Sequence, residues 1–167
     1  MTTAVLVPLS EYLGTTYHPD CDYVEGILKE RNVGEISHGE AQTALGAYVR
    51  YKIRGFWTVV EVRVQIKPDR FRIPDVTIVR GGKPSGRIIT APPEVVVEVL
   101  SPDDRAADIQ EKIDDYLAFG VPCVWVINPE TRRAWIHTNA GSRESKDGAL
   151  RNPAGDIEVP LSAIFTD

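Results

Sequence analysis

The pattern of apolar and polar residues divides the chain into helices and strands that follow one another in mixed order. From Val95 to Leu100, every residue except Glu98 is Val or Leu. A short apolar run of this kind predicts a strand that is buried on both faces of an α/β sheet. A carboxylate inside such a strand is costly unless it is paired or binds a metal. Glu98 is therefore the first candidate for a residue with a chemical role.

The neighbouring segments predict two long helices and several further strands. The helices are expected over 37–54 and 102–119, with Ser37 and Ser101 as N-caps and Gly55 and Gly120 after the last turns. The strands are expected over 22–31 (a hairpin broken at Gly26), 57–67, 72–79, 121–127, 133–137 and, at an edge, 157–159. The strands 57–67 and 72–79 should pair antiparallel. Helical turns are expected at 8–13 and 161–165, and 139–156 reads as a loop or weak hairpin. Helices packed on a mixed sheet predict an α/β layer fold.

The composition bounds the class of protein. A chain of 167 residues, 43% of them hydrophobic, is expected to form one globular domain over 1–167, with its core over about 22–138 and a C-terminal loop and edge strand over 139–167. No apolar run is long enough to span a membrane, and the first ten residues lack a secretory signal pattern. The two widely separated cysteines favour a reducing, cytoplasmic compartment. The net charge of −5 argues mildly against nonspecific coating of nucleic acid.

Two further residues join Glu98 as candidates for chemistry. Asp75 stands at the start of a strand otherwise made of Ile, Val and Thr. At about 100° per residue, Lys112 falls inside the apolar arc of the helix 102–119 and is expected to point toward the sheet, whereas Asp115 falls outside the arc. Asp75 and Glu98 on adjacent strands would hold a hard divalent cation such as Mg²⁺. Lys112 would then position a water or stabilise charge that develops during the reaction.

Each of these residues also has a purely structural interpretation. Asp75 is equally typical of a turn at the start of a strand. Glu98 could form an ion pair with an arginine such as Arg72 or Arg105. Lys112 could extend past the apolar face to reach water.

A series of short motifs lies between about Tyr23 and Ile136. The motifs are Ile73-Pro74-Asp75, Val97-Glu98-Val99-Leu100-Ser101-Pro102, Lys112, Tyr116, Gly120-Val121 and Trp125-Val126-Ile127-Asn128-Pro129. Together they closely resemble the Uma2 family, also called DUF820, which is similar to the PD-(D/E)XK nuclease superfamily. The resemblance implies a restriction-endonuclease-like core, in which helices flank a mixed central β-sheet and a Mg²⁺ or Mn²⁺ ion binds at one end of the sheet.

The resemblance also assigns roles to individual residues. Pro74-Asp75 matches the PD of the motif, and Glu98-Val99-Leu100 stands where (D/E)XK belongs. Leu100 takes the place of the motif lysine, and Lys112 matches the position to which that lysine has moved in Uma2 proteins. The resemblance therefore implies Asp75 and Glu98 as metal ligands and Asp75, Glu98 and Lys112 as the catalytic residues.

An acid on the first helix often assists the metal in this superfamily. Glu40 or Glu35 matches that role loosely, and Gln42 and His38 are weaker candidates. Apart from the resemblance, charge and capping explain Glu35 and Glu40, and packing at the helix start explains His38 better than ligation does.

Two functions stay open at the level of the sequence. The first is a divalent-metal-dependent endonuclease that hydrolyses phosphodiester bonds in DNA. The second is a catalytically inactive nuclease-fold module that binds nucleic acid or protein. Scattered basic residues could line a path for the phosphates of a nucleic acid, and an ordinary solvated surface explains them equally well. They are Arg50, Lys52, Arg54, Arg63, Lys67, Arg70 and Arg72. A homodimer is expected, with the hairpin Val121–His137 as its interface.

Overall fold

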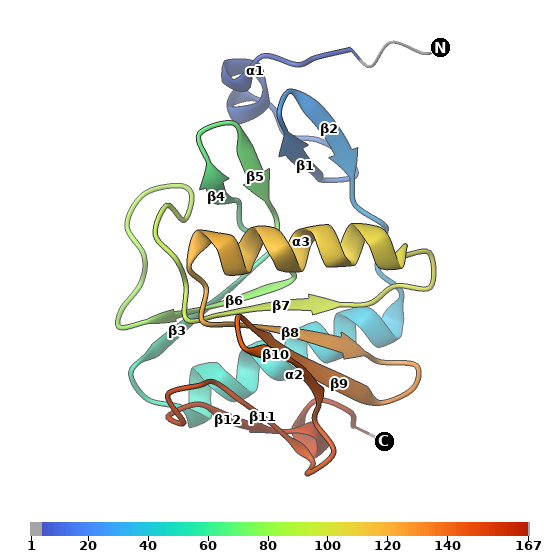
Figure 1. The fold of residues 1–167 in the computed structure, drawn as a ribbon, viewed down its shortest axis with the longest axis vertical. Coiled ribbons are helices and arrows are strands. Elements are labelled where there is room, and N and C mark those ends of the chain that lie inside the picture. The colour runs from blue at the N-terminus through green and yellow to red at the C-terminus, as the bar shows by residue number, and fades with distance from the viewer. Residues whose placement is uncertain (1–4, 167) are drawn as a thin grey trace.

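The helix α3 (Ala106–Phe119) lies between two β-sheets in the computed structural model, which describes residues 5–166 (Figure 1). Over these residues the large sheet has six strands in the order β10 (Gly141–Glu144), β9 (Arg133–Thr138), β8 (Cys123–Asn128), β7 (Val95–Val99), β6 (Val76–Arg80) and β3 (Phe56–Val60). The small sheet has the order β2 (Ile27–Glu30), β1 (Cys21–Val24), β5 (Arg70–Arg72) and β4 (Val64–Lys67). The helix α2 (Ile36–Lys52) covers the opposite face of the large sheet.

Shorter elements close the two ends of the molecule. The helix α1 (Leu9–Gly14) packs on the small sheet, where Tyr12 stacks on Tyr23. At the other end, β11 (Ala149–Arg151) pairs with β12 (Glu158–Pro160), and η1 (Leu161–Ala163) follows (Figure 1). In the large sheet, β7 and β8 are parallel and the remaining pairs are antiparallel. The predicted α/β class with a mixed central sheet flanked by helices is therefore confirmed.

The strand β7 is buried on both faces, as its sequence predicted. Val95, Val97 and Val99 belong to the core on the α2 side, and Val96 belongs to the core on the α3 side. The alternation places Glu98 on the α3 side, because side chains two apart in a strand share a face. Glu98 therefore faces α3 from the centre of the large sheet.

Two long strands predicted from the sequence are each divided in the structure. The expected strand 57–67 ends at Glu61, whose φ of 51° turns the chain, so that β3 joins the large sheet and β4 the small one. The expected strand 72–79 is interrupted as well: its first residue, Arg72, ends β5, and Ile73-Pro74-Asp75 separates β5 from β6. The predicted antiparallel pairing holds within each half, between β3 and β6 and between β4 and β5. Alternation alone carries no signal for a change of sheet, because it reports which face a side chain takes and not which strand lies beside it.

The helix α2 begins one residue before its predicted start, and α3 begins four residues after its predicted start. Glu35 occupies the N-cap position of α2, and the Ser37 hydroxyl instead donates to Glu130 at 2.8 Å. Ser101 lies in a turn, in which its N–H donates to the Asp104 carboxylate at 2.7 Å, and α3 begins only at Ala106. The predicted end of α3 is confirmed, because Gly120 adopts a left-handed φ of 106°.

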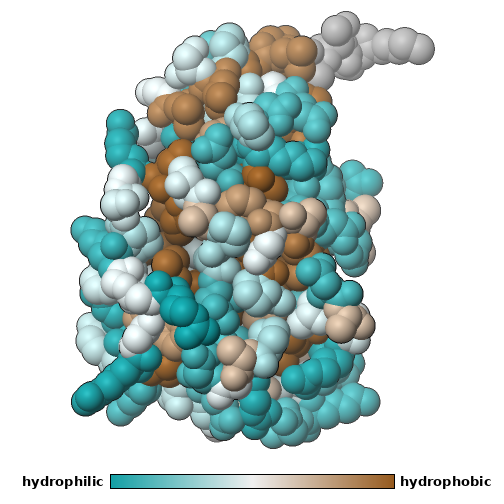
Figure 2. Space-filling model, turned by 60° about the vertical axis from the view of Figure 1, so that its left-hand side comes forward, coloured by the Kyte–Doolittle hydropathy of each residue, from teal (hydrophilic) through white to brown (hydrophobic). Residues whose placement is uncertain are grey.

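The C-terminal region adds strands beyond those expected. In 139–156, β10 extends the large sheet next to β9. The strand predicted at 157–159 corresponds to β12, which pairs with β11 in a separate two-stranded sheet. The hairpin expected as a dimer interface has its first strand, β8, in the core, and its second strand, β9, is partly buried between β8 and β10. Exposed apolar side chains lie elsewhere in the chain, among them Val5, Val33, Ile36 and Tyr51. The face shown in Figure 2 carries apolar surface at its upper end. Within residues 5–166 no helix is long and apolar enough to cross a membrane.

A buried ion cluster joins α3 to the small sheet. Arg72 on β5 donates to Asp115 at 2.5 and 2.8 Å, to Glu111 at 2.9 Å and to Asp22 at 3.2 Å. Arg70 adds a bond to Asp115 at 2.6 Å. Asp115 falls outside the apolar arc of α3 as predicted, yet it is buried, because the small sheet covers this face of the helix. The cluster holds α3 in position over the large sheet.

We expect Arg72→Met to lower the free energy of unfolding by about 3–5 kcal/mol, because it leaves Asp22 and Asp115 buried without their cation. Urea unfolding followed by circular dichroism measures this change. The control is Arg151→Met, which removes a partly exposed arginine with two exposed acidic partners and should destabilise far less. Equal destabilisation by the two substitutions would contradict a structural role for the cluster.

Candidate functional site

A cavity of about 360 Å³ opens where β6 and β7 approach α3 and the segment that joins β2 to α2. Among the described residues, seven carboxylates and five lysine or arginine side chains line it. The excess of acids makes the cavity suited to cations rather than to a bare phosphate. The three residues selected from the sequence, Asp75, Glu98 and Lys112, are all among its walls.

The register of the large sheet brings Asp75 and Glu98 together. Val76 at the start of β6 is paired with Val97 on β7 in an antiparallel register. The residue before Val76 and the residue after Val97 are therefore opposite each other across the two strands. These residues are Asp75 and Glu98. Asp75 directly precedes β6 and Glu98 lies in β7, so the two acids are neighbours across this strand pair, as expected.

Asp75 is held from three sides. Its Oδ1 accepts a hydrogen bond from the Arg31 guanidinium, and its Oδ2 accepts one from the Val99 N–H at 2.6 Å. The His38 Nε2 lies 3.4 Å from the same Oδ2. Burial raises the pKa of Asp75, but the hydrogen bond to His38 and the charge of Arg31 outweigh burial and lower it, so the group stays a carboxylate. The hydrogen bond to Asp75 in turn raises the pKa of His38.

Glu98 is held by α3. Its Oε2 accepts a hydrogen bond from Lys112 Nζ at 3.0 Å, and its Oε1 accepts one from the Tyr116 hydroxyl at 2.6 Å. Burial raises the pKa of Glu98, and the nearby charge of Asp75 adds to this, although the charge of Lys112 opposes it. Burial disfavours the charged form of Lys112, but the charge of Glu98 outweighs burial and raises the lysine pKa. Lys112 is therefore an ammonium ion at neutral pH.

These contacts decide between the structural alternatives. Glu98 pairs with Lys112 rather than with Arg72 or Arg105, because Arg72 is committed to the buried cluster on the small sheet. The Lys112 side chain is only 16% exposed, so it does not extend to water as the alternative supposed. The inward orientation that the helical arc predicted for Lys112 is the one observed.

The accessory candidates separate into two groups. His38 borders the cavity, and Gln42 Nε2 donates to the backbone carbonyl of Asp75 at 2.9 Å. Glu35 and Glu40 are exposed, and in the part of the chain that the structure describes neither of them lines the cavity. The first turns of α2 thus bring a histidine and an amide to Asp75, and the loosely matched acids point to solvent.

Arg31 is the site residue that the sequence analysis missed. It directly follows β2, and in the sequence it looks like any arginine at the end of a hairpin. Its side chain is only 13% exposed and contacts Asp75, 44 residues further along the chain. Sequence periodicity has no means of detecting a pair of this separation.

The donor set fits a hydrated magnesium or manganese ion. Asp75 and Glu98 present carboxylate oxygens, which such ions prefer, and Mg²⁺ commonly binds one or two carboxylates and keeps several waters. Among residues 5–166 no group of three or more His, Cys, Asp or Glu side chains is arranged to enclose a metal. The residues therefore suit an ion shared with water and substrate rather than a closed structural metal site.

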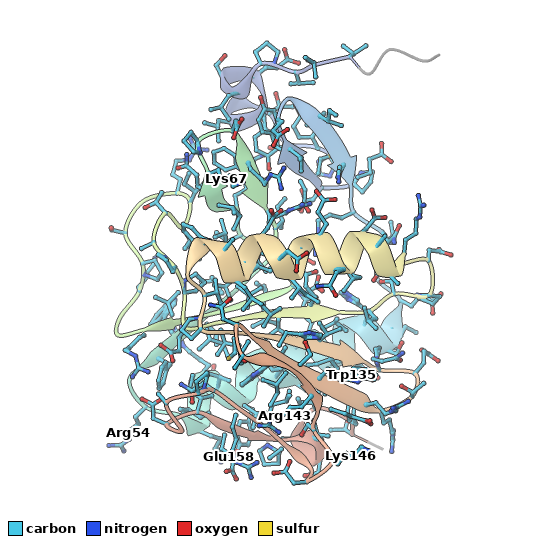
Figure 3. The ribbon with its side chains drawn as sticks, viewed as in Figure 1. Arg54, Lys67, Trp135, Arg143, Lys146 and Glu158 are labelled. Atoms are coloured by element: carbon cyan, nitrogen blue, oxygen red, sulfur yellow. The ribbon has the colours of Figure 1, made fainter. Side chains whose placement is uncertain are left out.

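The seven basic residues considered for a phosphate path do not form one continuous track. Arg72 is buried in its ion cluster, and Arg50 lies over the ring of Trp57. Figure 3 places Arg54 and Lys67 at widely separated positions, near the lower and the upper end of the molecule. Of the seven, Arg72 lines the cavity, where Arg31 and Lys112 are further basic side chains of the wall.

Comparisons with known proteins identify the family and the fold. The model of the family described as "Uma2: Putative restriction endonuclease" matches residues 11–158. A comparison with curated proteins finds no significant match. Among solved structures, the chain is similar to a protein from Anabaena variabilis ATCC 29413 described as a "putative nuclease belonging to DUF820". The TM-score is 0.76 at 19% sequence identity, over 95% of this chain and 97% of that one, which establishes a shared fold.

We expect Gly34→Ala to lower the pKa of His38 relative to the unsubstituted protein. A Cβ at position 34 would lie 2.8 Å from His38 Nδ1, so the ring must shift and its contact with Asp75 weakens. An NMR titration of the histidine ring signals measures the change, with His137, whose pKa burial lowers, as the internal control. An unchanged His38 titration in the folded variant would show that Gly34 does not position the ring.

Proposed function

Because the chain belongs to the Uma2 family, we propose that it is a divalent-metal-dependent endonuclease that hydrolyses phosphodiester bonds in DNA. The observation that carries this proposal is the pairing of Asp75 with Glu98 beside an inward ammonium group in one acidic cavity. Each buried carboxylate costs desolvation free energy. Two of them side by side are therefore better explained by a chemical role than by a structural one.

Asp75 and Glu98 are the proposed ligands of a Mg²⁺ or Mn²⁺ ion. Such an ion supplies a Lewis acid and lowers the pKa of a bound water. The remaining chemistry belongs to the side chains. Val99 N–H and His38 keep the Asp75 carboxylate oriented, and Tyr116 does the same for Glu98.

Lys112 is proposed to act as a fixed positive charge. Because the charge of Glu98 raises its pKa, Lys112 retains its proton at neutral pH and does not serve as a general base. An ammonium group in this place stabilises negative charge that develops on the phosphate oxygens. Leu100, at the position of the motif lysine, packs with the apolar residues under α3, which is consistent with a lysine that has moved to the helix.

Other properties expected from the sequence remain predictions. They are a single domain over 1–167, a homodimer and a cytoplasmic location. The alternative of a catalytically inactive nuclease-fold module also remains, since it is favoured by Leu100 in the motif and by the acidic charge of the chain.

A plasmid-nicking assay with purified protein in Mg²⁺, Mn²⁺ or EDTA tests the proposed activity. Cleavage should require the metal, and Glu98→Gln, Asp75→Asn and Lys112→Met should each reduce the rate by roughly 10²-fold or more, the usual magnitude for loss of a key electrostatic group. The matched control is Glu158→Gln, which removes an exposed acid at the lower end of the molecule in Figure 3 and should leave the rate unchanged.

The same assay distinguishes the alternative function. Cleavage that persists in folded Glu98→Gln would contradict the site assignment. Absence of cleavage of plasmid, single-stranded DNA and RNA, together with metal-independent retention of DNA in a gel-shift experiment, would favour a binding module. Cleavage that survives Lys112→Met but not Asp75→Asn would leave the metal ligands in place and remove the lysine from the mechanism.

A further inference from the structure

Arg31 forms an ion pair with Asp75, which is one of the two proposed metal ligands. Its guanidinium donates to Asp75 Oδ1. Burial raises the pKa of Glu98, and the charge of Arg31 partly opposes this increase. Both side chains of the Arg31–Asp75 pair are largely withdrawn from water, with 13% and 3% of their surfaces exposed. The contact is therefore a buried ion pair inside the candidate site.

The remaining oxygen of Asp75 is engaged as well. Oδ2 accepts from the Val99 N–H at 2.6 Å and faces His38 at 3.4 Å. A divalent ion that binds Asp75 must therefore approach Oδ1, where the guanidinium lies. Two cations a few ångströms apart in a buried site repel each other strongly. The metal and Arg31 in its observed position are accordingly in competition.

Arg31 is better placed to move than the other cation at the site. Lys112 projects from the middle of α3 and packs inside its apolar arc. Arg31 belongs to the segment between β2 and α2, where its backbone N–H is tied to the Asp20 carbonyl at 2.9 Å and its long side chain lines the cavity. Rotation about the side-chain bonds can move the guanidinium through the cavity without moving the backbone.

We propose that a divalent metal displaces Arg31 from Asp75 and that the released guanidinium binds a phosphate of the DNA substrate. A guanidinium matches a phosphate in a bidentate geometry, and its own negative partner is then neutralised by the metal. Arg31 is thus a competing cation for the metal and a ligand for the substrate. This inference rests on the proposed metal-dependent nuclease function.

Manganese binding measured by isothermal titration calorimetry, without DNA, tests the competition. Arg31→Met should bind Mn²⁺ roughly tenfold more tightly than the unsubstituted protein, about the effect of one charge-assisted hydrogen bond. Arg31→Lys, which keeps the charge, should stay close to the unsubstituted protein. The control is Arg105→Met, which removes an exposed cation of the same cavity wall and should change the affinity by a smaller factor.

Thermal unfolding gives a second readout that does not depend on activity. In EDTA, Arg31→Met should unfold at a lower temperature than the unsubstituted protein, because Asp75 is then buried beside Glu98 without its own cation. Mn²⁺ should raise the unfolding temperature of Arg31→Met by more than it raises that of the unsubstituted protein, since tighter binding stabilises more. If Arg31→Met does not fold, the comparison is made with Arg31→Gln.

DNA binding tests the phosphate contact. With Ca²⁺ in place of Mg²⁺, the slope of log affinity against log salt for a plasmid-derived duplex should be smaller by about one for Arg31→Met, the change expected for one lost phosphate contact. An unchanged slope would overturn the substrate role.

The outcomes separate this inference from the proposed function. In one outcome, the unsubstituted protein binds Mn²⁺, Glu98→Gln does not, and Arg31→Met binds it equally well or more weakly. This outcome would overturn the competition and support the metal site. Absence of Mn²⁺ binding in the unsubstituted protein and in Arg31→Met would overturn both. Binding seen only in Arg31→Met would support the competition in its strongest form.

Discussion

Two carboxylates buried side by side impose the main constraint on this structure. Asp75 and Glu98 stand opposite each other where β6 and β7 meet. Both side chains are buried, so water does not solvate either carboxylate. Each obtains a cation from a different part of the chain, Asp75 from the segment after β2 and Glu98 from α3. The desolvation cost of the pair thus requires the small sheet, α3 and the large sheet to meet at one place.

The position of α3 between two sheets follows from its two different faces. One face carries Ile113 and Tyr116 into the core of the large sheet and delivers Lys112 to Glu98. The other carries Asp115 to the arginines of β5. Because Lys112 and Asp115 are on one rigid helix, the ion cluster on the small sheet also sets where the site ammonium lies. Stability and site geometry are therefore linked through a single element.

The candidate site was predicted in part from local sequence patterns. Glu98 and Lys112 are each polar residues at positions where the period of the element demands an apolar one, and such exceptions can be recognised within a few residues. Arg31 and the buried state of Asp115 carry no such exception. Each depends on a contact with a segment more than 40 residues away in sequence. Neither the spacing of residues nor the residue type identifies that partner.

The sequence by itself determined the order of most elements, the burial of β7 and the inward orientation of Lys112, because these follow from periodicities of two and 3.6 residues within one element. The placement of Asp75 and Glu98 on adjacent strands was expected from the residues themselves, and the family motifs gave the same pair. Only the tertiary structure decided that two predicted strands divide between different sheets, that a second sheet covers α3 and that Arg31 neutralises Asp75. These features arise from packing between distant segments, whose energy is absent from any local pattern of residues.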